Sequence, residues 1–370
     1  MTAKLGVAAA LVDGAVVPGD VMVDRDDGSI VAVGVHPPGS RGLAVPGFVD
    51  LQVNGFVGVD FTDADVEGYA QVGEAMAATG VTAYQPTLIS LPETSYEAAL
   101  ERLGAARRTV PGPRILGAHL EGPFLSPERA GAHDPVWMTD PDLDLLDRLL
   151  AAGPVGYMTV APERPGGLEL VSHLVDRGVV VAVGHSDADA AIGHEAFDRG
   201  ARAVTHLFNA LRPFHHRRPG VVAAALVHPG VVVTLIVDGI HLAADAVRLA
   251  ASAARSRYAL VTDAIAAAGR GDGRYPLGDR YVDVRGKEAR LEDGTLAGSV
   301  LTMDLAVRNL IELGFDPIEA IGAATTVPAS VIGRPELGTL APGTPADVVV
   351  LDDDHTVTRT LVAAEEVFAG

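Results

Sequence analysis

The chain has 370 residues, 48% of them hydrophobic, so a large buried core is available and long disordered regions are not expected. Its 28 basic and 48 acidic residues give a net charge of −20, which argues against a nucleic-acid partner because such a partner selects a basic face. It has no cysteine, so disulfides and thiolate metal sites are excluded, and any metal must be held by histidines and carboxylates. No stretch offers the roughly 18 uninterrupted apolar residues of a membrane helix, and the apolar LGVAAALV near the N-terminus lacks the marks of a signal peptide. These totals predict a soluble cytoplasmic protein without a membrane partner.

Both ends of the chain carry short strand patterns. KLGVAAALV, GDVMVDR and SIVAVGV are separated by turn signals, and ADVVVLDDD, TVTRTLV and EEVFAG near the C-terminus have the same texture. We expect residues 1–44 and 336–370 to pair as one small β-sandwich.

The middle of the chain, residues 45–335, alternates apolar runs of strand length with helix-length stretches, many of which end in glycine. The runs are LAVPGFVDL (43–51), VTAYQPTL (81–88), PRILGAHL (113–120), VGYMTV (155–160), VVVAVG (179–184), ARAVTH (201–206), VVVTLIV (231–237) and YALVTD (258–263). Buried strands that are each followed by a helix predict a parallel sheet, and eight such units predict an α/β fold of the (β/α)8 barrel type. An open doubly wound sheet is the alternative, but the first run continues as DLQVNG, which is no phosphate-binding loop. A turn-rich insert (268–298) and closing helices follow the eighth run.

Polar residues stand at the C-terminal ends of these runs, where barrels carry their chemistry. Glu121, His185 and His206 end or follow the third, fifth and sixth runs, and Asp263 ends the eighth. A buried carboxylate is costly unless it is paired or holds a cation, so a metal explains why a buried strand ends in Glu121. Two imidazoles and one carboxylate with an open position suit a catalytic divalent metal, and an aspartate beside it can carry a proton. A single histidine at a strand end is more often structural, so the prediction depends on the joint placement of the set.

The segment RPFHHRRPG (212–220) concentrates cationic side chains in an acidic chain. A solvated loop is the ordinary fate of such a run. Because the segment follows the sixth run, it is also placed to act as a phosphate or carboxylate clamp at the barrel mouth.

At these residues the sequence resembles the N-acetylglucosamine-6-phosphate deacetylases of the amidohydrolase superfamily. The resemblance covers about residues 46 to 352 through these blocks, in this order: PGFVDLQVNGFVGVDF, HLEGPFL with AGAH, GHSDA, THLFNAL, VDGIH, VTDAIAAAG, LAGSVLTMD and LGTLAPGTPADVVVLD. It implies hydrolysis of the N-acetyl group of N-acetylglucosamine 6-phosphate to glucosamine 6-phosphate and acetate, in amino sugar catabolism. It also implies a homodimer, or a higher homo-oligomer, in which phosphate contacts are completed across the interface.

The resemblance assigns roles to individual residues. Glu121, His185 and His206 match the metal ligands, and Asp263 matches the catalytic aspartate. The residues that match substrate contacts are Ala132, His133, Asn209, Ala210, Arg217, His241, Leu296, Ala297 and Gly298.

One position separates the branches of the superfamily. Many members place His-x-His at the end of the first strand for a second metal, whereas this chain has Gln52 and Asn54. Amides are poorer ligands, so we expect one divalent ion per subunit, with zinc first and iron, cobalt or manganese as alternatives.

Two other functions compete with this prediction. Another amidohydrolase, such as a cyclic-amide hydrolase, would carry His-x-His and often a metal-bridging lysine, but the only lysines are Lys4 and Lys287, away from the strand ends. A non-catalytic sugar-phosphate-binding barrel would have lost Asp263 or a ligand. A metal assay combined with an acetate-release assay separates the three.

Overall fold

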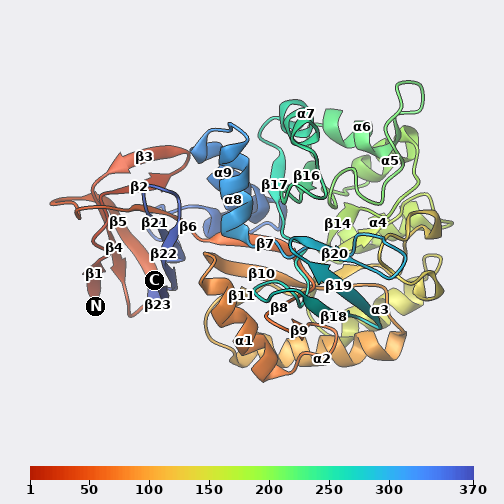
Figure 1. The fold of residues 1–370 in the computed structure, drawn as a ribbon, viewed down its shortest axis with the longest axis horizontal. Coiled ribbons are helices and arrows are strands. Elements are labelled where there is room, and N and C mark those ends of the chain that lie inside the picture. The colour runs from red at the N-terminus through yellow and green to blue at the C-terminus, as the bar shows by residue number, and fades with distance from the viewer.

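Eight parallel strands form the barrel that the apolar runs predict. In the computed structural model, which describes residues 1–370, neighbouring strands pair in parallel in the expected order (Figure 1). The strands are β7 (Phe48–Val53), β10 (Val81–Leu88), β12 (Ala118–Glu121), β13 (Val155–Val160), β14 (Val180–Val183), β15 (Ala203–Val204), β16 (Val232–Leu235) and β17 (Tyr258–Leu260). The short β11 (Arg114–Ile115) precedes β12 and also pairs with β10. Almost every residue in these strands is buried, as expected of strands covered on both faces.

The first and last strands close the ring through a short seam. The backbone N–H of Asp263 donates to the carbonyl of Gln52 at 2.9 Å. The carboxylate of Asp50 accepts from the backbone N–H of Thr262 at 3.3 Å and from its hydroxyl at 2.6 Å. The predicted (β/α)8 barrel is confirmed, and its closure depends partly on a buried side chain.

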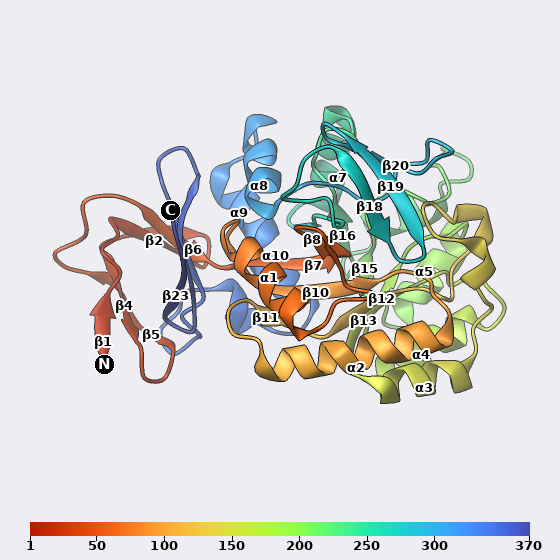
Figure 2. The same ribbon diagram turned by 60° about the horizontal axis from the view of Figure 1, so that its bottom comes forward.

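Helices cover the outside of the barrel (Figure 2). They are α1 (Val66–Ala77), α2 (Glu93–Thr109), α3 (Leu143–Ala152), α4 (Gly167–Asp176), α5 (Ala190–Asp198), α6 (Gly220–Val227), α7 (Ala244–Ala254), α8 (Met303–Glu312), α9 (Pro317–Ala324) and α10 (Thr326–Val331). Four begin after an aspartate whose side chain accepts from a backbone N–H of the first turn, namely Asp65, Asp142, Asp189 and Asp316. None of the helices is both long and apolar enough to cross a bilayer.

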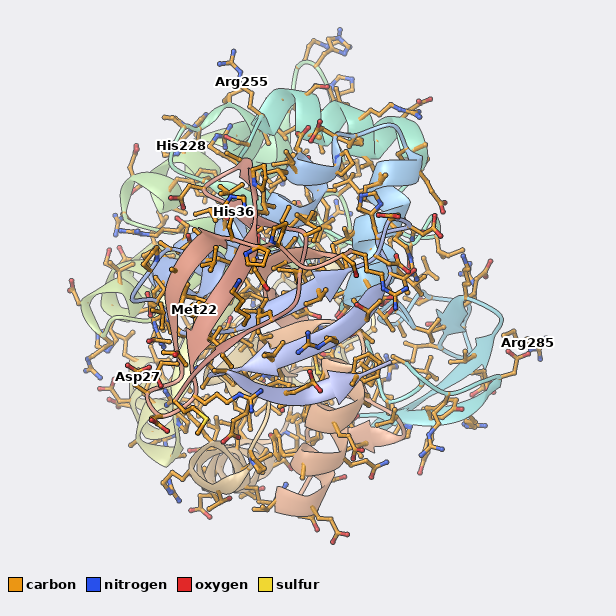
Figure 3. The ribbon with its side chains drawn as sticks, turned by 90° about the vertical axis from the view of Figure 1, so that its left-hand side faces the viewer. Met22, Asp27, His36, His228, Arg255 and Arg285 are labelled. Carbon is orange, nitrogen blue, oxygen red and sulfur yellow. The ribbon has the colours of Figure 1, made fainter.

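The two ends of the chain form a β-sandwich beside the barrel. The sandwich faces the viewer in Figure 3. One sheet has the order β1-β4-β5 and the other the order β23-β22-β21-β6-β2-β3. Their bounds are β1 (Thr2–Lys4), β2 (Ala9–Val12), β3 (Ala15–Pro18), β4 (Asp20–Asp24), β5 (Ser29–Val35), β6 (Leu43–Pro46), β21 (Val348–Leu351), β22 (Val357–Val362) and β23 (Glu365–Ala369). Since β6 pairs with both β2 and β21, N- and C-terminal segments share one sheet, as predicted. The division at residues 44/45 and 335/336 stays a prediction about folding units; β6 spans the first of these limits.

The insert after the eighth strand is an antiparallel sheet of β18 (Gly273–Leu277), β19 (Arg280–Arg285) and β20 (Glu288–Arg290). The sequence predicted only turns here. A second small ribbon, β8 (Gly55–Phe56) with β9 (Val59–Asp60), follows the first barrel strand. Short 3-10 turns complete the fold as η1 (Pro127–Arg129), η2 (Pro135–Trp137) and η3 (Pro335–Gly338).

Candidate active site

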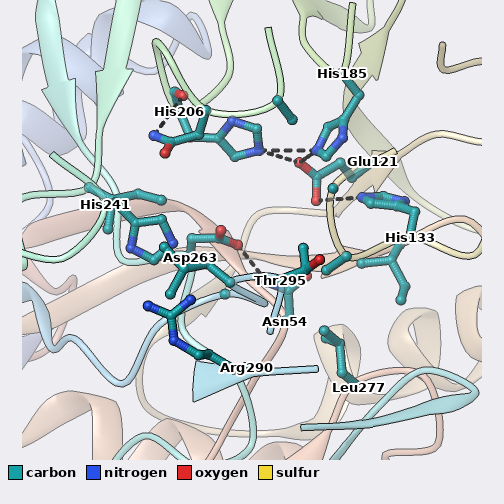
Figure 4. A pocket seen from close by; sticks show the side chains of 18 residues that line it. Asn54, Glu121, His133, His185, His206, His241, Asp263, Leu277, Arg290 and Thr295 are labelled. Atoms are coloured by element: carbon teal, nitrogen blue, oxygen red, sulfur yellow. Dashed lines mark hydrogen bonds and ion pairs between the residues drawn. The ribbon is translucent and has the colours of Figure 1, made fainter. Parts of the chain in front are cut away.

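Three donor atoms from separate strands converge at the barrel mouth (Figure 4). Glu121 is the last residue of β12, while His185 and His206 follow β14 and β15. The two histidine Nε2 atoms lie 3.1 Å apart, and Glu121 Oε1 lies 3.2 Å from the first and 3.0 Å from the second. All three side chains are buried, and their donor atoms are close enough to share one ion. Two imidazoles and one carboxylate are a donor set that fits a divalent metal with an open coordination position.

The backbone is strained at three residues of the site that follow barrel strands. The φ angles of His185, His206 and Asp263 are +46°, +30° and +49°. Non-glycine residues rarely adopt this left-handed region, and the cost is on the order of 1–3 kcal/mol each. Strain of this kind clusters at functional sites, and here it falls on three side chains that line one pocket.

The ring of His185 is held in one tautomer. Its Nδ1 lies 2.9 Å from the carbonyl oxygen of Arg129 in η1. A carbonyl only accepts, so Nδ1 carries the proton and Nε2 offers a free lone pair towards Glu121 and His206. Gly131 keeps the neighbouring loop close, since a Cβ there would lie 3.1 Å from the His185 ring.

Glu121 is held as a carboxylate. Burial alone would favour its neutral form, but the close imidazoles of His133, His185 and His206 outweigh burial and hold the pKa of Glu121 well below its ordinary value. A charged Glu121 is the form that binds a cation.

Two amides at the C-terminal end of the first barrel strand contact carboxylates of the site. Gln52 Nε2 donates to Glu121 Oε1 at 3.0 Å, and Asn54 Nδ2 donates to Asp263 Oδ1 at 2.7 Å. Gln52 and Asn54 therefore orient the two acids of the site.

Asp263 stands beside the ligand cluster with only 8% of its surface exposed. Burial, followed by the nearby charge of Glu121, raises the pKa of Asp263 to about 6. Its Oδ2 makes no hydrogen bond with the protein and is free towards the pocket. A carboxylate that titrates near neutrality can both take and return a proton.

His133 presents an N–H to the same space. The backbone N–H of Ser90 donates to His133 Nδ1 at 3.1 Å, so the proton of the neutral ring is on Nε2. That Nε2 lies 3.5 Å from Glu121 Oε2. Burial, followed by the charge of His185, lowers the pKa of His133 to about 4, so the ring is neutral near pH 7.

These groups line a cavity of about 390 Å³, within the range of roughly 300–1,000 Å³ that is typical of small-molecule sites. Its lining residues are Asn54, Ile89, Glu121, Gly131, Ala132, His133, His185, His206, Asn209, Ala210, Ile236, His241, Asp263, Leu277, Arg290, Thr295, Leu296 and Gly298.

The structure brings most of the predicted site residues to this cavity. Among the expected substrate contacts, those that line it are Ala132, His133, Asn209, Ala210, His241, Leu296 and Gly298. Ala297 is fully buried behind the wall, and Arg217 is exposed on the 212–220 loop, where its Nη1 lies 2.8 Å from His216 Nε2. Within one subunit, Arg217 does not reach the cavity.

Other lining residues were not predicted from the sequence. Arg290 and Thr295 come from the insert, and Ile89 and Leu277 add apolar walls. The search of barrel strand ends for polar residues could not find Leu277, Arg290 and Thr295, because the insert is not part of the barrel, and it passed over Ile89 after β10 because that residue is apolar. The alternation of apolar and charged residues over Val282–Arg285, which lie in β19, was the available signal that the insert forms strands rather than turns alone.

The sequence matches the amidohydrolase family over residues 43–367, and the chain belongs to this family. It is 38% identical over 341 residues to the N-acetylglucosamine-6-phosphate deacetylase of Danio rerio, a match that covers 88% of this chain and 84% of that protein. It is also 38% identical over 315 residues to the N-acetylgalactosamine-6-phosphate deacetylase of Escherichia coli O157:H7, with 84% of each chain covered. Among solved structures it superposes with a TM-score of 0.93 on an aspartate-to-alanine variant of the Mycobacterium smegmatis N-acetyl-D-glucosamine-6-phosphate deacetylase in complex with N-acetyl-D-glucosamine-6-phosphate. The identity is 36%, and the match covers 100% of this chain and 99% of that one.

Proposed function

We propose that this chain hydrolyses the acetamide of N-acetylglucosamine 6-phosphate, giving glucosamine 6-phosphate and acetate. The observation that carries the proposal is the convergence of Glu121, His185 and His206 beside Asp263 in a sugar-sized cavity. The similarity to amino-sugar-phosphate deacetylases over most of the chain supports it.

One divalent ion per subunit, zinc in the first place, is the proposed cofactor. The ligands would be Glu121, His185 and His206, a donor set that suits zinc and that iron, cobalt or manganese also accept. When bound, the ion polarises an amide carbonyl and lowers the pKa of a water molecule. Gln52 and Asn54 offer only amides near this position, which supports a single ion.

The chain's own residues handle the protons. Asp263 takes a proton from the water that attacks the acetyl carbon and delivers it to the amide nitrogen as the C–N bond breaks. His133 donates its Nε2–H to the acetyl oxygen as negative charge develops there. The water oxygen leaves in acetate, and the nitrogen leaves as the sugar amine.

The remaining lining residues orient the sugar. Ala132, Asn209 and Ala210 lie on the loops after β12 and β15, and Leu296 and Gly298 line the same cavity from the insert. His241 would contact the phosphate, with Arg217 as its second contact.

We include a homodimer in the proposal, because Arg217 is exposed and does not line the cavity of its own subunit. A partner subunit is the simplest source of this guanidinium. Phe214, 58% exposed on the same loop, is apolar surface that such an interface would cover. A cytoplasmic location follows from the substrate class, because phosphorylated sugars do not cross bilayers unaided.

The test is acetate release from N-acetylglucosamine 6-phosphate by protein of measured metal content. N-acetylgalactosamine 6-phosphate, unphosphorylated N-acetylglucosamine and a cyclic amide are the comparison substrates. Zinc-loaded protein that binds the sugar phosphate but releases no acetate would leave only the binding-barrel alternative. Preference for the cyclic amide would point to the other amidohydrolase alternative.

A further inference from the structure

The cavity contains one permanently charged cation, and it is not on the loop that the sequence suggested. Among the lining residues the only lysine or arginine is Arg290, the last residue of β20. In Figure 4 its guanidinium points towards His241 and Asp263, on the side of the cavity away from Glu121, His185 and His206. The metal-ligating end and the cationic end are thus separated.

The guanidinium of Arg290 is held in place by hydrogen bonds that occupy only some of its donors. Its Nε donates to Glu288 Oε2 at 2.7 Å and its Nη1 donates to the carbonyl of Gly294 at 2.7 Å. Nη2 makes no hydrogen bond with the protein, so two N–H donors are free at the cavity. An arginine fixed by two contacts loses little further freedom when it binds an anion, which favours phosphate recognition.

The insert that carries Arg290 is tied to the barrel mouth through the turn between β18 and β19 and through the first residue of β19. The backbone N–H of Gly278 donates to Asp60 Oδ2 at 2.9 Å, and Trp137 Nε1 donates to Asp279 Oδ2 at 2.7 Å. Arg280 Nη1 donates to the carbonyl of Ala132 at 3.0 Å. These contacts hold the sheet over the cavity, so the position of Arg290 is set by the fold.

From this geometry we infer that Arg290 binds the phosphate group of the sugar substrate together with His241, and so helps select phosphorylated over unphosphorylated N-acetylhexosamines. The inference rests on the proposed function for the identity of the sugar. It does not need a second subunit, because Arg290 and His241 belong to the same chain and line the same cavity.

The experiment compares Arg290→Gln with Arg285→Gln, a control on the same small sheet that is exposed and outside the cavity (Figure 3). Arg290→Gln should raise the KM for N-acetylglucosamine 6-phosphate by about tenfold to a hundredfold, the loss expected for charge-assisted hydrogen bonds. It should leave kcat/KM for unphosphorylated N-acetylglucosamine within about twofold of wild type, and Arg290→Lys should recover part of the loss. Arg285→Gln should behave as wild type.

Inorganic phosphate separates failure of this inference from failure of the proposed function. Calorimetry should show phosphate binding to the zinc-loaded wild-type protein that weakens in Arg290→Gln but not in Arg285→Gln. If wild type releases no acetate but shows this pattern, the proposed function fails and the anion site stands. Equal losses for both sugars, or unchanged KM and phosphate binding in Arg290→Gln, would overturn the inference.

Discussion

His185 Nδ1 lies 2.9 Å from the carbonyl oxygen of Arg129, and the guanidinium of Arg129 contacts Asp187, two residues beyond that histidine. The two Arg129–Asp187 hydrogen bonds measure 2.8 Å and 2.6 Å, and Asp187 also pairs with Arg212 on the loop after β15. One carboxylate therefore joins three mouth loops, and the same contacts fix the carbonyl that orients a predicted metal ligand.

Asp187→Asn should weaken metal binding, because the carbonyl of Arg129 is then free to move away from His185. Residues that orient a ligand commonly contribute about tenfold to a hundredfold in metal affinity, and we expect the lower end of that range. Zinc affinity measured by competition with a chelator checks the prediction. Asp147→Asn is the matched control, since Asp147, like Asp187, pairs with two basic side chains, here those of His173 and Arg177, but lies outside the cavity. Unchanged zinc affinity in folded Asp187→Asn would contradict the assigned role.

Asp263→Asn should abolish turnover while leaving the metal content near that of wild type. Asparagine keeps the size of the side chain and can still pair with Asn54, but it cannot carry a proton between water and the leaving nitrogen. Loss of a positioned acid–base group costs about a hundredfold to ten-thousandfold in kcat. Acetate release and metal analysis on the same preparation test both parts, and retained turnover would sink the proton-transfer role.

Metal removal should lower the melting temperature. An ion that binds the folded chain but not the unfolded chain stabilises the fold by mass action. Without it, Glu121, His185 and His206 remain crowded around one point with Nε2 atoms 3.1 Å apart. Calorimetry of chelator-treated protein should show a melting temperature that rises with added zinc in wild type but not in His206→Asn. A rise of equal size in both proteins would mean that zinc acts elsewhere.

Asp50 should make stability depend on pH. It is fully buried at the barrel seam, and burial raises its pKa to about 7 against the hydrogen bonds from Thr262 and Gln52. In the unfolded chain an aspartate titrates near 4, so the folded pKa is the higher one. The stabilisation from protonated Asp50 is therefore complete below about pH 4 and is lost as the pH rises through about 7.

The corresponding experiment compares wild type with Asp50→Asn. Between about pH 5 and about pH 8, the free energy of unfolding of wild type should fall relative to the variant by on the order of 1–3 kcal/mol. Urea unfolding across this range measures the difference. Because the loss of hydrogen bonds in the variant does not depend on pH, only the slope is diagnostic, and parallel curves would contradict a raised pKa.

The apolar runs in the sequence were sufficient to predict the strands of the barrel, but they were less informative about the loops at its mouth. The run VTAYQPTL becomes β10 with the same limits, Val81–Leu88, because a strand covered on both faces is buried along its whole length. The run ARAVTH shrinks to Ala203–Val204, because the chain bends sharply at His206, where φ is +30°. A local turn of this kind positions a side chain of the site and produces no hydrophobic periodicity in the sequence.

Loop direction was the part that the sequence could not determine. The family resemblance assigned Arg217 as a substrate contact, yet nothing in the composition of the 212–220 loop says whether the loop folds over the cavity of its own subunit. The place of Arg290 in the cavity could not be predicted for another reason. Arg290 lies in an insert whose position on the barrel depends on contacts between residues distant in sequence, such as Asp60 with Gly278.

The ion pair between Arg114 and Asp347 should couple the sandwich to the barrel. Arg114 in β11 donates from Nε to Asp347 Oδ2 at 2.6 Å and from Nη2 to Oδ1 at 3.0 Å. The side chain of Asp347, next to β21, is only 1% exposed, while that of Arg114 is 32% exposed. Arg114→Met would leave a buried carboxylate without its cation, at a cost of about 2 kcal/mol after allowing for partial solvent screening.

Urea unfolding should show this loss of stability in Arg114→Met. The control is Arg148→Met, which breaks the exposed pair with Glu93 and should not change stability measurably because surface pairs contribute little. Equal stability of the two variants would mean that the sandwich is held by its apolar contacts alone.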